Sequence, residues 1–242
     1  NVEHATLKGL VNMTSEEPLK IDGYLPRLMM GNSDIRETRL DLQASDSNGI
    51  GLNLNSYLVQ DNGYINARLD SEAADDQLTN QISFDLEQEK TSADGEMLIT
   101  MDFLRDGTDQ LASDIRIHPT SLIFNGKRVD FNDATINYRK EQISINNFGL
   151  REENMLLLGI EGVASKSEAD FVRIYFNNTE LANILAVFNV SNFAGSINGD
   201  IFVRQMLESP MVHTEDLRIE DITVYNDTIG TFTIEANWDN LY

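Results

Sequence analysis

Apolar and polar residues alternate along most of this chain, a pattern typical of β-strands with two different faces. The alternation is clearest in the second half, where it predicts strands over Gln142–Phe148, Met155–Val163, Phe171–Phe176, Ser196–Arg204, Leu217–Tyr225 and Thr228–Trp238. In the first half it predicts strands over Ala5–Met13, Leu19–Met30, Ile35–Ala44, Gly49–Val59, Tyr64–Leu69, Gln81–Leu86 and Glu96–Phe103. The chain is therefore expected to be all-β.

The segments between these strands are short and contain turn residues, as at Asn125-Gly126, Arg151–Asn154 and Asn226-Asp227. Short connections favour antiparallel hairpins over parallel strands joined by helices. One segment departs from the alternation: Leu181, Ile184, Leu185 and Phe188 have the spacing of a helix face, which predicts a short helix near 179–188.

The chain has no Pro-, Gly- or Ser-rich linker that would divide it clearly. Residues 1–110 are expected to form a β-rich N-terminal segment, a possible sub-domain, followed by a second segment over 111–242. The polar stretch Asp70–Asn80 is the main candidate for a loop or boundary, and Gln88–Asp94 is another.

Charge narrows the classes of partner. The 242 residues include 18 Lys and Arg against 40 Asp and Glu, a formal net charge of −22. Such a surface repels phosphate backbones and anionic headgroups, so nucleic-acid binding and basic membrane anchoring are not expected. The absence of cysteine excludes thiol catalysis, disulfides and thiolate metal sites. The chain starts at Asn1 and has no long apolar run, so we expect it to be part of a larger protein.

From residue 115 to about 238 the sequence resembles the long β repeat region of the TamB family, within the AsmA-like group and particularly its Bacteroidetes members. The segments that carry the resemblance are Ile115–Phe124, Asn125–Val129, Ala134–Tyr138, Ile143–Leu150, Met155–Gly162, Val172–Leu185 and Ala194–Ile201. The last of these contains a Gly-x-Ile-x-Gly-x-Ile unit that follows the predicted helix, as in that group.

The resemblance implies an elongated, mostly antiparallel sheet curled over an apolar interior, a β-taco-like fold. It also implies a periplasmic protein, anchored at the inner membrane by an N-terminal segment outside this chain. The implied function is transport of phospholipid between the inner and outer membranes, or outer-membrane assembly, by means of an apolar β groove that serves as a lipid conduit. The implied partners are phospholipid acyl chains, and an outer-membrane barrel protein that would bind other parts of the protein. Candidate groove-lining residues are Ile143, Ile145, Leu156, Leu158, Val172, Ile174, Phe176, Ile197, Ile201, Val203, Phe232 and Ile234.

No motif of an enzyme, a metal site or a cofactor site occurs, so we expect no catalytic residue, no metal and no cofactor. Asp227-Thr228-Ile229 matches a short O-glycosylation triplet of Bacteroidetes envelope proteins, which makes Thr228 a candidate modification site. Two alternatives to a lipid conduit stay open. One is a β-sandwich or β-solenoid that serves as a binding or scaffold module of the envelope. The other is a hydrolase with convergent carboxylates.

Overall fold

A computed structural model describes residues 2–12, 14–31, 33–45, 49–60, 63–89, 91–105, 111–182, 193–225 and 227–238. It confirms the all-β prediction, because nearly all of these residues lie in strands and every strand pairing is antiparallel. The chain forms two compact units. Unit 1 comprises Asn1–Leu104 and Thr120–Arg128, and unit 2 comprises Arg105–Pro119 and Val129–Tyr242.

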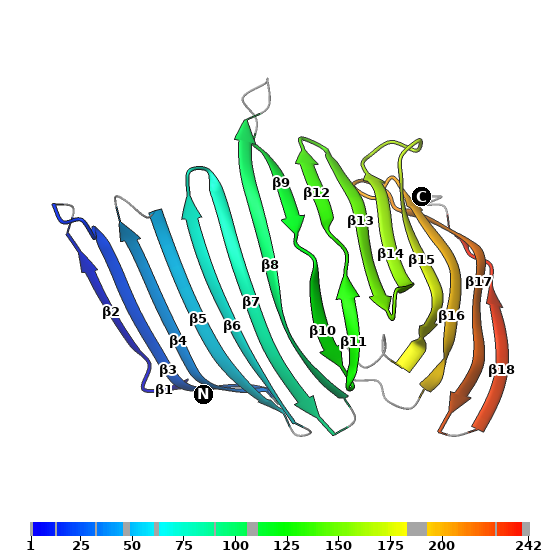
Figure 1. The fold of residues 1–242 in the computed structure, drawn as a ribbon, viewed down its shortest axis with the longest axis horizontal. Coiled ribbons are helices and arrows are strands. Elements are labelled where there is room, and N and C mark those ends of the chain that lie inside the picture. Colours follow the sequence, from blue (N-terminus) through cyan, green and yellow to red (C-terminus); the bar gives the residue numbers. More distant parts are fainter. Residues whose placement is uncertain are drawn as a thin grey trace. The chain divides into compact units, whose positions relative to one another are not determined.

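From β2 to β8, unit 1 is a meander in which each strand is hydrogen-bonded to the next along the chain (Figure 1). Its strands are β1 (Val2–Glu3), β2 (Thr6–Val11), β3 (Leu19–Met30), β4 (Ser33–Ser45), β5 (Gly49–Gln60), β6 (Gly63–Ala74), β7 (Gln77–Gln88), β8 (Thr91–Arg105) and β10 (Thr120–Phe124). Both β1 and β2 pair with β3, and β10 pairs with β8.

Unit 2 continues the same kind of meander. Its strands are β9 (Leu111–Ile117), β11 (Lys127–Phe131), β12 (Ala134–Arg139), β13 (Gln142–Glu152), β14 (Met155–Ala164), β15 (Phe171–Glu180), β16 (Phe193–Arg204), β17 (Met211–Val224), β18 (Asp227–Ile234) and β19 (Asn237–Trp238). The neighbours run β9–β12–β13–β14–β15–β16–β17–β18. In addition, β11 pairs with β13 and β19 pairs with β17.

Several hairpins close through two residues in the left-handed region, the backbone geometry that suits the twist of paired strands. Asn125 and Gly126 have φ of 48° and 76°, and Glu153 and Asn154 have φ of 48° and 71°, so both of these predicted turns are confirmed. The prediction of a loop or boundary over Asp70–Asn80 is wrong. Strand β6 runs to Ala74 and β7 begins at Gln77, with only Asp75 and Asp76 between them.

The short helix predicted near 179–188 begins later than expected. Thr179 and Glu180 complete strand β15, and only Leu181 and Ala182 are helical before residues 183–192, which lie outside the described residues. The predicted turn residue Asn226 also lies outside them.

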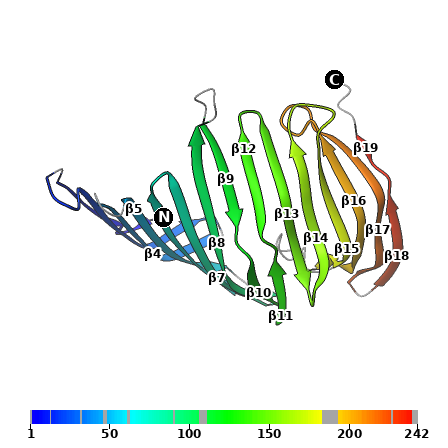
Figure 2. The same cartoon turned by 45° about the horizontal axis from the view of Figure 1, so that its top comes forward.

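The two units differ in how they bury apolar side chains. Among the described residues, unit 1 has no buried apolar side chain, and its strands form one layer (Figure 2). The buried apolar side chains all belong to unit 2: Ala112, Ile117, Ala134, Leu157, Ala164, Val172, Ile197, Leu217 and Ile222.

Candidate functional site

Strand register sorts the side chains of unit 1 onto two chemically different faces. Residues directly opposite each other in antiparallel strands point to the same side of the sheet, so the pairing identifies each face. The apolar face of unit 1 includes Leu7, Val11, Leu19, Ile21, Leu25, Leu40, Leu42, Ala44, Ile50, Leu52, Leu54, Leu58, Ile65, Ala67, Leu69, Ala73, Leu78, Ile82, Phe84, Leu86, Ala93, Met97, Ile99, Met101, Leu122 and Phe124. It extends from β2 to β10.

These apolar side chains line up in rows that cross the strands. The central row consists of directly paired residues, one from each strand between β2 and β8, and none of them is polar: Leu7, Gly23, Leu40, Leu54, Leu69, Ile82 and Met97. With neighbouring strands about 4.8 Å apart, its six steps span about 29 Å. An aliphatic strip, interrupted only where Gly23 contributes no side chain, therefore crosses unit 1 at right angles to its strands.

The apolar face of unit 1 is open to solvent in part. Leu7 and Val11 on the edge strand β2 are 72% and 69% exposed, and Ile50 is 50% exposed. Most of the other side chains on this face are half-buried, because they contact their neighbours within the same layer. A monomeric soluble protein rarely leaves a contiguous apolar area of this extent uncovered, so the face is a candidate binding surface.

Six polar residues on this face form three hydrogen-bonded pairs. The hydroxyl oxygens of Thr38 and Ser56 lie 2.9 Å apart, and the Ser71 hydroxyl donates to Asn80 Oδ1 at 2.8 Å. At the end of the face, Gln88 Nε2 donates to Gln60 Oε1 at 2.9 Å, across Gly63 of the intervening strand. Each pair satisfies part of its hydrogen bonding within the sheet, which lowers the cost of covering these groups with an apolar ligand.

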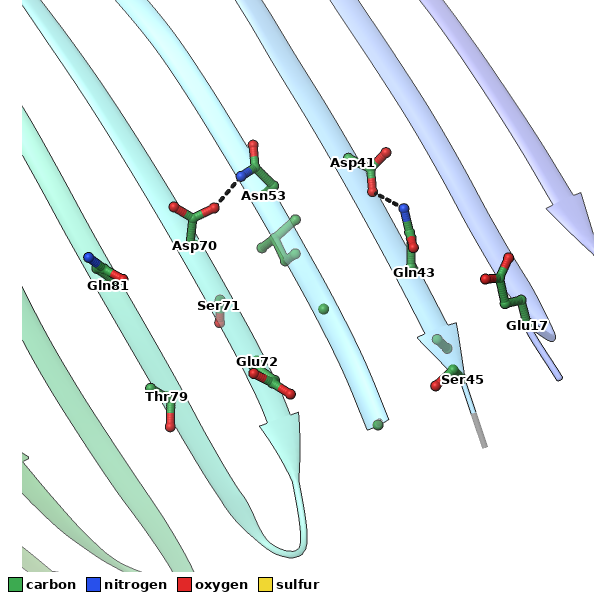
Figure 3. Close-up of a pocket in the computed structure, with 14 residues that line it drawn as sticks. Glu17, Asp41, Gln43, Ser45, Asn53, Asp70, Ser71, Glu72, Thr79 and Gln81 are labelled. Carbon is green, nitrogen blue, oxygen red and sulfur yellow. Dashed lines mark hydrogen bonds between the residues drawn. The ribbon is translucent and has the colours of Figure 1, made fainter. Parts of the chain in front are cut away.

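The opposite face of unit 1 is strongly polar. Figure 3 shows part of it, an open hollow of about 430 Å³ over β4–β7, where Gly51 contributes no side chain. Asp41 accepts a hydrogen bond from Gln43 at 2.7 Å, and Asp70 accepts one from Asn53. Water solvates these polar groups well, although Leu10, Leu98 and Ile123 are also exposed on this face.

A cluster of one carboxylate and two arginines lies at one end of the β3–β4 pair. Asp34, the only buried residue that the structure describes in unit 1, accepts hydrogen bonds from Arg27 Nε at 2.8 Å and from Arg36 Nη2 at 2.6 Å. The hydrogen bonds from Arg27 and then from Arg36 lower the pKa of the Asp34 carboxyl to about 2.

In unit 2 the register brings eleven of the twelve groove candidates onto one face. Pairings such as Ile174 with Ile201, and Ile197 with Ile219 and then Phe232, connect β15 to β18 on that side. On this apolar face of unit 2 lie Ile143, Ile145, Leu158, Val172, Ile174, Phe176, Ile197, Ile201, Val203, Phe232 and Ile234.

Leu156 is the exception, and its predicted position is wrong. A register shift pairs Leu150 with Leu158 but Arg151 with Leu156, so Leu157 is the extra residue of a β-bulge. The bulge turns Leu156 to the side of Arg151 and Gly149. Leu157, only 9% exposed, is buried in its place, and its carbonyl accepts a hydrogen bond from the Thr179 hydroxyl at 2.6 Å.

Repeated bulges help to explain why unit 2 buries side chains that unit 1, with one register shift beside the left-handed Glu37, leaves open. Asn147, Asn178, Asp216 and Asp221 have left-handed φ at or beside register shifts in β13, β15 and β17. Bulges increase the local bend and twist of a strand, which brings side chains on one face closer together. As a result Val172 is only 2% and Ile197 only 8% exposed, whereas Phe232 near the edge is 50% exposed.

The scattered Asn residues of the sequence therefore have a structural role in unit 2. Asn and Asp tolerate the left-handed conformation that a bulge requires better than other non-glycine residues. Glycine faces one of these bulges: a Cβ on Gly199, with φ of 112°, would lie 2.4 Å from the Asp216 carbonyl oxygen.

The outer face of unit 2 combines arginine with aromatic and acidic side chains. Arg173 contacts Asp200 at 3.0 Å and lies 4.9 Å from the ring centre of Tyr175. Arg204 lies 5.4 Å from the ring centre of Phe171. These contacts tie neighbouring strands together on the solvent side.

Among the described residues, no group of three His, Asp or Glu side chains could hold a metal ion. In that part of the chain, no helix is long and apolar enough to cross a membrane. The candidate modification site Thr228 is exposed at the start of β18.

Every groove-lining residue predicted from the sequence lies after residue 142, and none of them lies in unit 1. The signal was present, because β5–β7 alternate as regularly as the later strands. What the sequence alone lacked was the register, which shows that seven strands align their apolar positions in rows.

No protein-family model matches this sequence, and neither a curated protein nor a solved structure is significantly similar to it. The resemblance to the TamB family stays a prediction that rests on the sequence motifs.

Proposed function

We propose that this chain is a non-enzymatic segment of a periplasmic TamB/AsmA-like protein, and that its apolar sheet faces hold phospholipid acyl chains between the inner and outer membranes. The observation that carries the proposal is the apolar face of unit 1, which spans the strands from β2 to β10 without a buried apolar side chain among the described residues. Its localisation and its anchor in an N-terminal segment are parts of the same proposal.

The energetics favour an aliphatic ligand. Exposing an acyl chain to water costs roughly 0.8 kcal/mol per CH₂, so a sixteen-carbon chain costs on the order of 12 kcal/mol. A surface of Leu, Ile, Met and Phe side chains lowers that cost without any acid, base or nucleophile. The same contact removes apolar protein surface from water, which adds about 25 cal/mol per Å².

Mobility along such a surface requires that no polar group holds the chain at one place. The central row supports this, because none of its residues from Leu7 to Met97 is polar. An acyl chain that follows this row meets no charge and no hydrogen-bonding side chain.

Burial in unit 2 favours the alternative that the chain is a binding or scaffold module. There Val172 and Ile197 are buried, as expected for a wall or a closed core rather than for an open groove. A β-sandwich in unit 1 would need a second layer over its apolar face, and no described strand of unit 1 lies there (Figure 2). We therefore propose unit 1 as the main lipid surface.

A pair of neighbouring residues on β5 tests the proposal. Leu54 lies in the central row, and Asn55 is half-buried on the opposite face, where it pairs with Arg68. A photo-crosslinking amino acid at Leu54 should capture phospholipid from cells or from phosphatidylethanolamine vesicles, about tenfold more than one at Asn55, because only Leu54 is on the aliphatic surface. Mass spectrometry of the adducts gives the ratio.

The same experiment at Ile145 and Ile201 examines unit 2. Capture at both would extend the lipid surface to the apolar face of unit 2, and its absence there would assign that unit to the scaffold. Equal labelling at Leu54 and Asn55, or no lipid at Leu54, would overturn the proposal for unit 1.

A further inference from the structure

We infer that an acyl chain over strands β4–β7 of unit 1 lies across these strands, along the central row, and that two hydrogen-bonded pairs, Ser71–Asn80 and Thr38–Ser56, determine this direction. The inference rests on the proposed function and adds the orientation of the ligand and the residues that set it.

The position of the two pairs relative to the central row carries the argument. Ser71 and Asn80 are directly opposite each other on β6 and β7, two residues from Leu69 and Ile82 of the central row. At about 3.4 Å per residue, this pair lies about 7 Å to one side of the row. It interrupts any path that follows β6 or β7.

Thr38 and Ser56 occupy the corresponding place on the other side. They lie on β4 and β5, two residues from Leu40 and Leu54 of the central row, and their hydroxyl oxygens are 2.9 Å apart. A chain aligned with any of the four middle strands, β4–β7, therefore has to cover one of these polar groups. A chain along the central row covers none.

The hydrogen bonds within each pair leave some polar capacity unused. The Ser71 hydroxyl donates to the Asn80 carbonyl, and among the hydrogen bonds of the described residues no protein acceptor receives the Asn80 amide hydrogens. Covering them with a methylene chain would remove their water partners, which is unfavourable. An acyl chain can lie beside these pairs at no cost, but an acyl chain directly on top of them is disfavoured. The pairs therefore act as borders of the central row.

The test uses the intact chain with vesicles of phosphatidylcholine that carries a nitroxide at carbon 5 or at carbon 16 of one acyl chain. Methyl NMR detects which Leu, Ile and Met side chains the nitroxide broadens. Moving the nitroxide from carbon 5 to carbon 16 should shift the strongest broadening between strands, for example between Leu40 and Met97, and leave the pattern within β5 unchanged.

Two outcomes would overturn the inference and leave the proposed function intact. One is a shift within a single strand, from Leu52 to Leu58 of β5. The other is broadening that does not depend on the position of the nitroxide. If no methyl group on the apolar face of unit 1 is broadened by either lipid, the proposed function itself fails.

A double variant tests the role of the border directly. S71A/N80L replaces the pair with apolar groups of similar size. In this variant, the strongest broadening over β6 and β7 should no longer move from strand to strand when the nitroxide moves from carbon 5 to carbon 16. The matched control, N53A/D70A, removes a hydrogen-bonded pair on the polar face and should leave the pattern of the unsubstituted chain. An unchanged pattern in S71A/N80L would contradict the assigned role.

Discussion

The Asp34 carboxylate shows how a single residue is fixed at the end of an open sheet. Its side chain is 10% exposed and accepts hydrogen bonds from two arginines that are themselves 40% and 46% exposed. Two guanidinium groups stabilise the ionised form, which holds the pKa at about 2 instead of the ordinary 3.8.

The sign of the pH dependence follows from that shift. Because the folded pKa is lower than the unfolded one, the carboxylate stabilises the fold fully above the ordinary value of 3.8 and loses this effect as the pH falls towards 2. The difference in urea midpoint between the unsubstituted chain and Asp34→Asn should therefore shrink over this range.

A second measurement isolates the cause. In Arg36→Gln, the carboxyl resonance of Asp34 should titrate closer to 3.8 than in the unsubstituted chain, because one of the two charged donors is gone. Arg39→Gln removes an arginine from the same strand that has no contact with Asp34 in the structure, and it should leave the titration unchanged. If the Asp34 carboxyl titrates with the same midpoint pH in the unsubstituted chain, Arg36→Gln and Arg39→Gln, the two arginines are not the cause of the lowered pKa.

At the scale of the strand, bulges are more frequent in unit 2 than in unit 1, whose described strand pairs show one register shift, between Arg36 and Arg39. The register of β16 and β17 shifts between Asn198 and Asp200, where Gly199 opposes the left-handed Asp216. A Cβ on Gly199 would lie 2.6 Å from the Leu217 Cα, so the strands would have to separate.

We expect Gly199→Ala to destabilise the protein by about 2 kcal/mol or more, from the backbone clash and the unfavourable φ together. Urea unfolding of the protein measures the loss. The matched control is Gly51→Ala on β5, where the added methyl group meets no atom within 4 Å. Its unfolding should change little, and equal losses in the two variants would refute the explanation.

Alternation predicted the strands but not the bulges. The second half of the chain was assigned correctly in outline because Ile143–Ile145 and Phe171–Phe176 alternate without a break. The face of Leu156 was wrong because one extra residue, Leu157, reverses the alternation, and sequence spacing alone does not reveal that shift. Two other bulges, in β13 and β15, had a signal in the sequence: the adjacent asparagines at 146–147 and 177–178, since Asn is favoured in left-handed bulge positions.

Polarity also misled the reading of Asp70–Asn80. A run of Asp, Ser and Glu suggests a loop, but here Asp70 and Glu72 point to the polar face of unit 1, Ala73 and Leu78 continue the apolar face, and only Asp75 and Asp76 form the turn. A single-layer sheet has one fully solvated side, so half of its strand residues resemble loop residues in composition.

At the scale of the whole molecule, the apolar faces and the net charge of −22 act against each other. Uncovered aliphatic surface drives association, whereas like charges spread over the chain oppose it. The balance depends on salt, because the screening length falls from about 30 Å at 0.01 M to about 3 Å at 1 M ionic strength.

We therefore expect the lipid-free protein to be monomeric at about 0.01 M salt and to self-associate reversibly near 1 M, where charge repulsion no longer opposes contact between apolar faces. Sedimentation velocity measures both states. A short-chain non-ionic detergent should reverse the association, since it covers the same surface. The variant L54S/L69S, with two central-row residues made polar, should associate less than the control N55S/R68S on the opposite face. A protein that stays monomeric at high salt, or that associates equally in both variants, would show that the apolar face of unit 1 is not the surface that needs a partner.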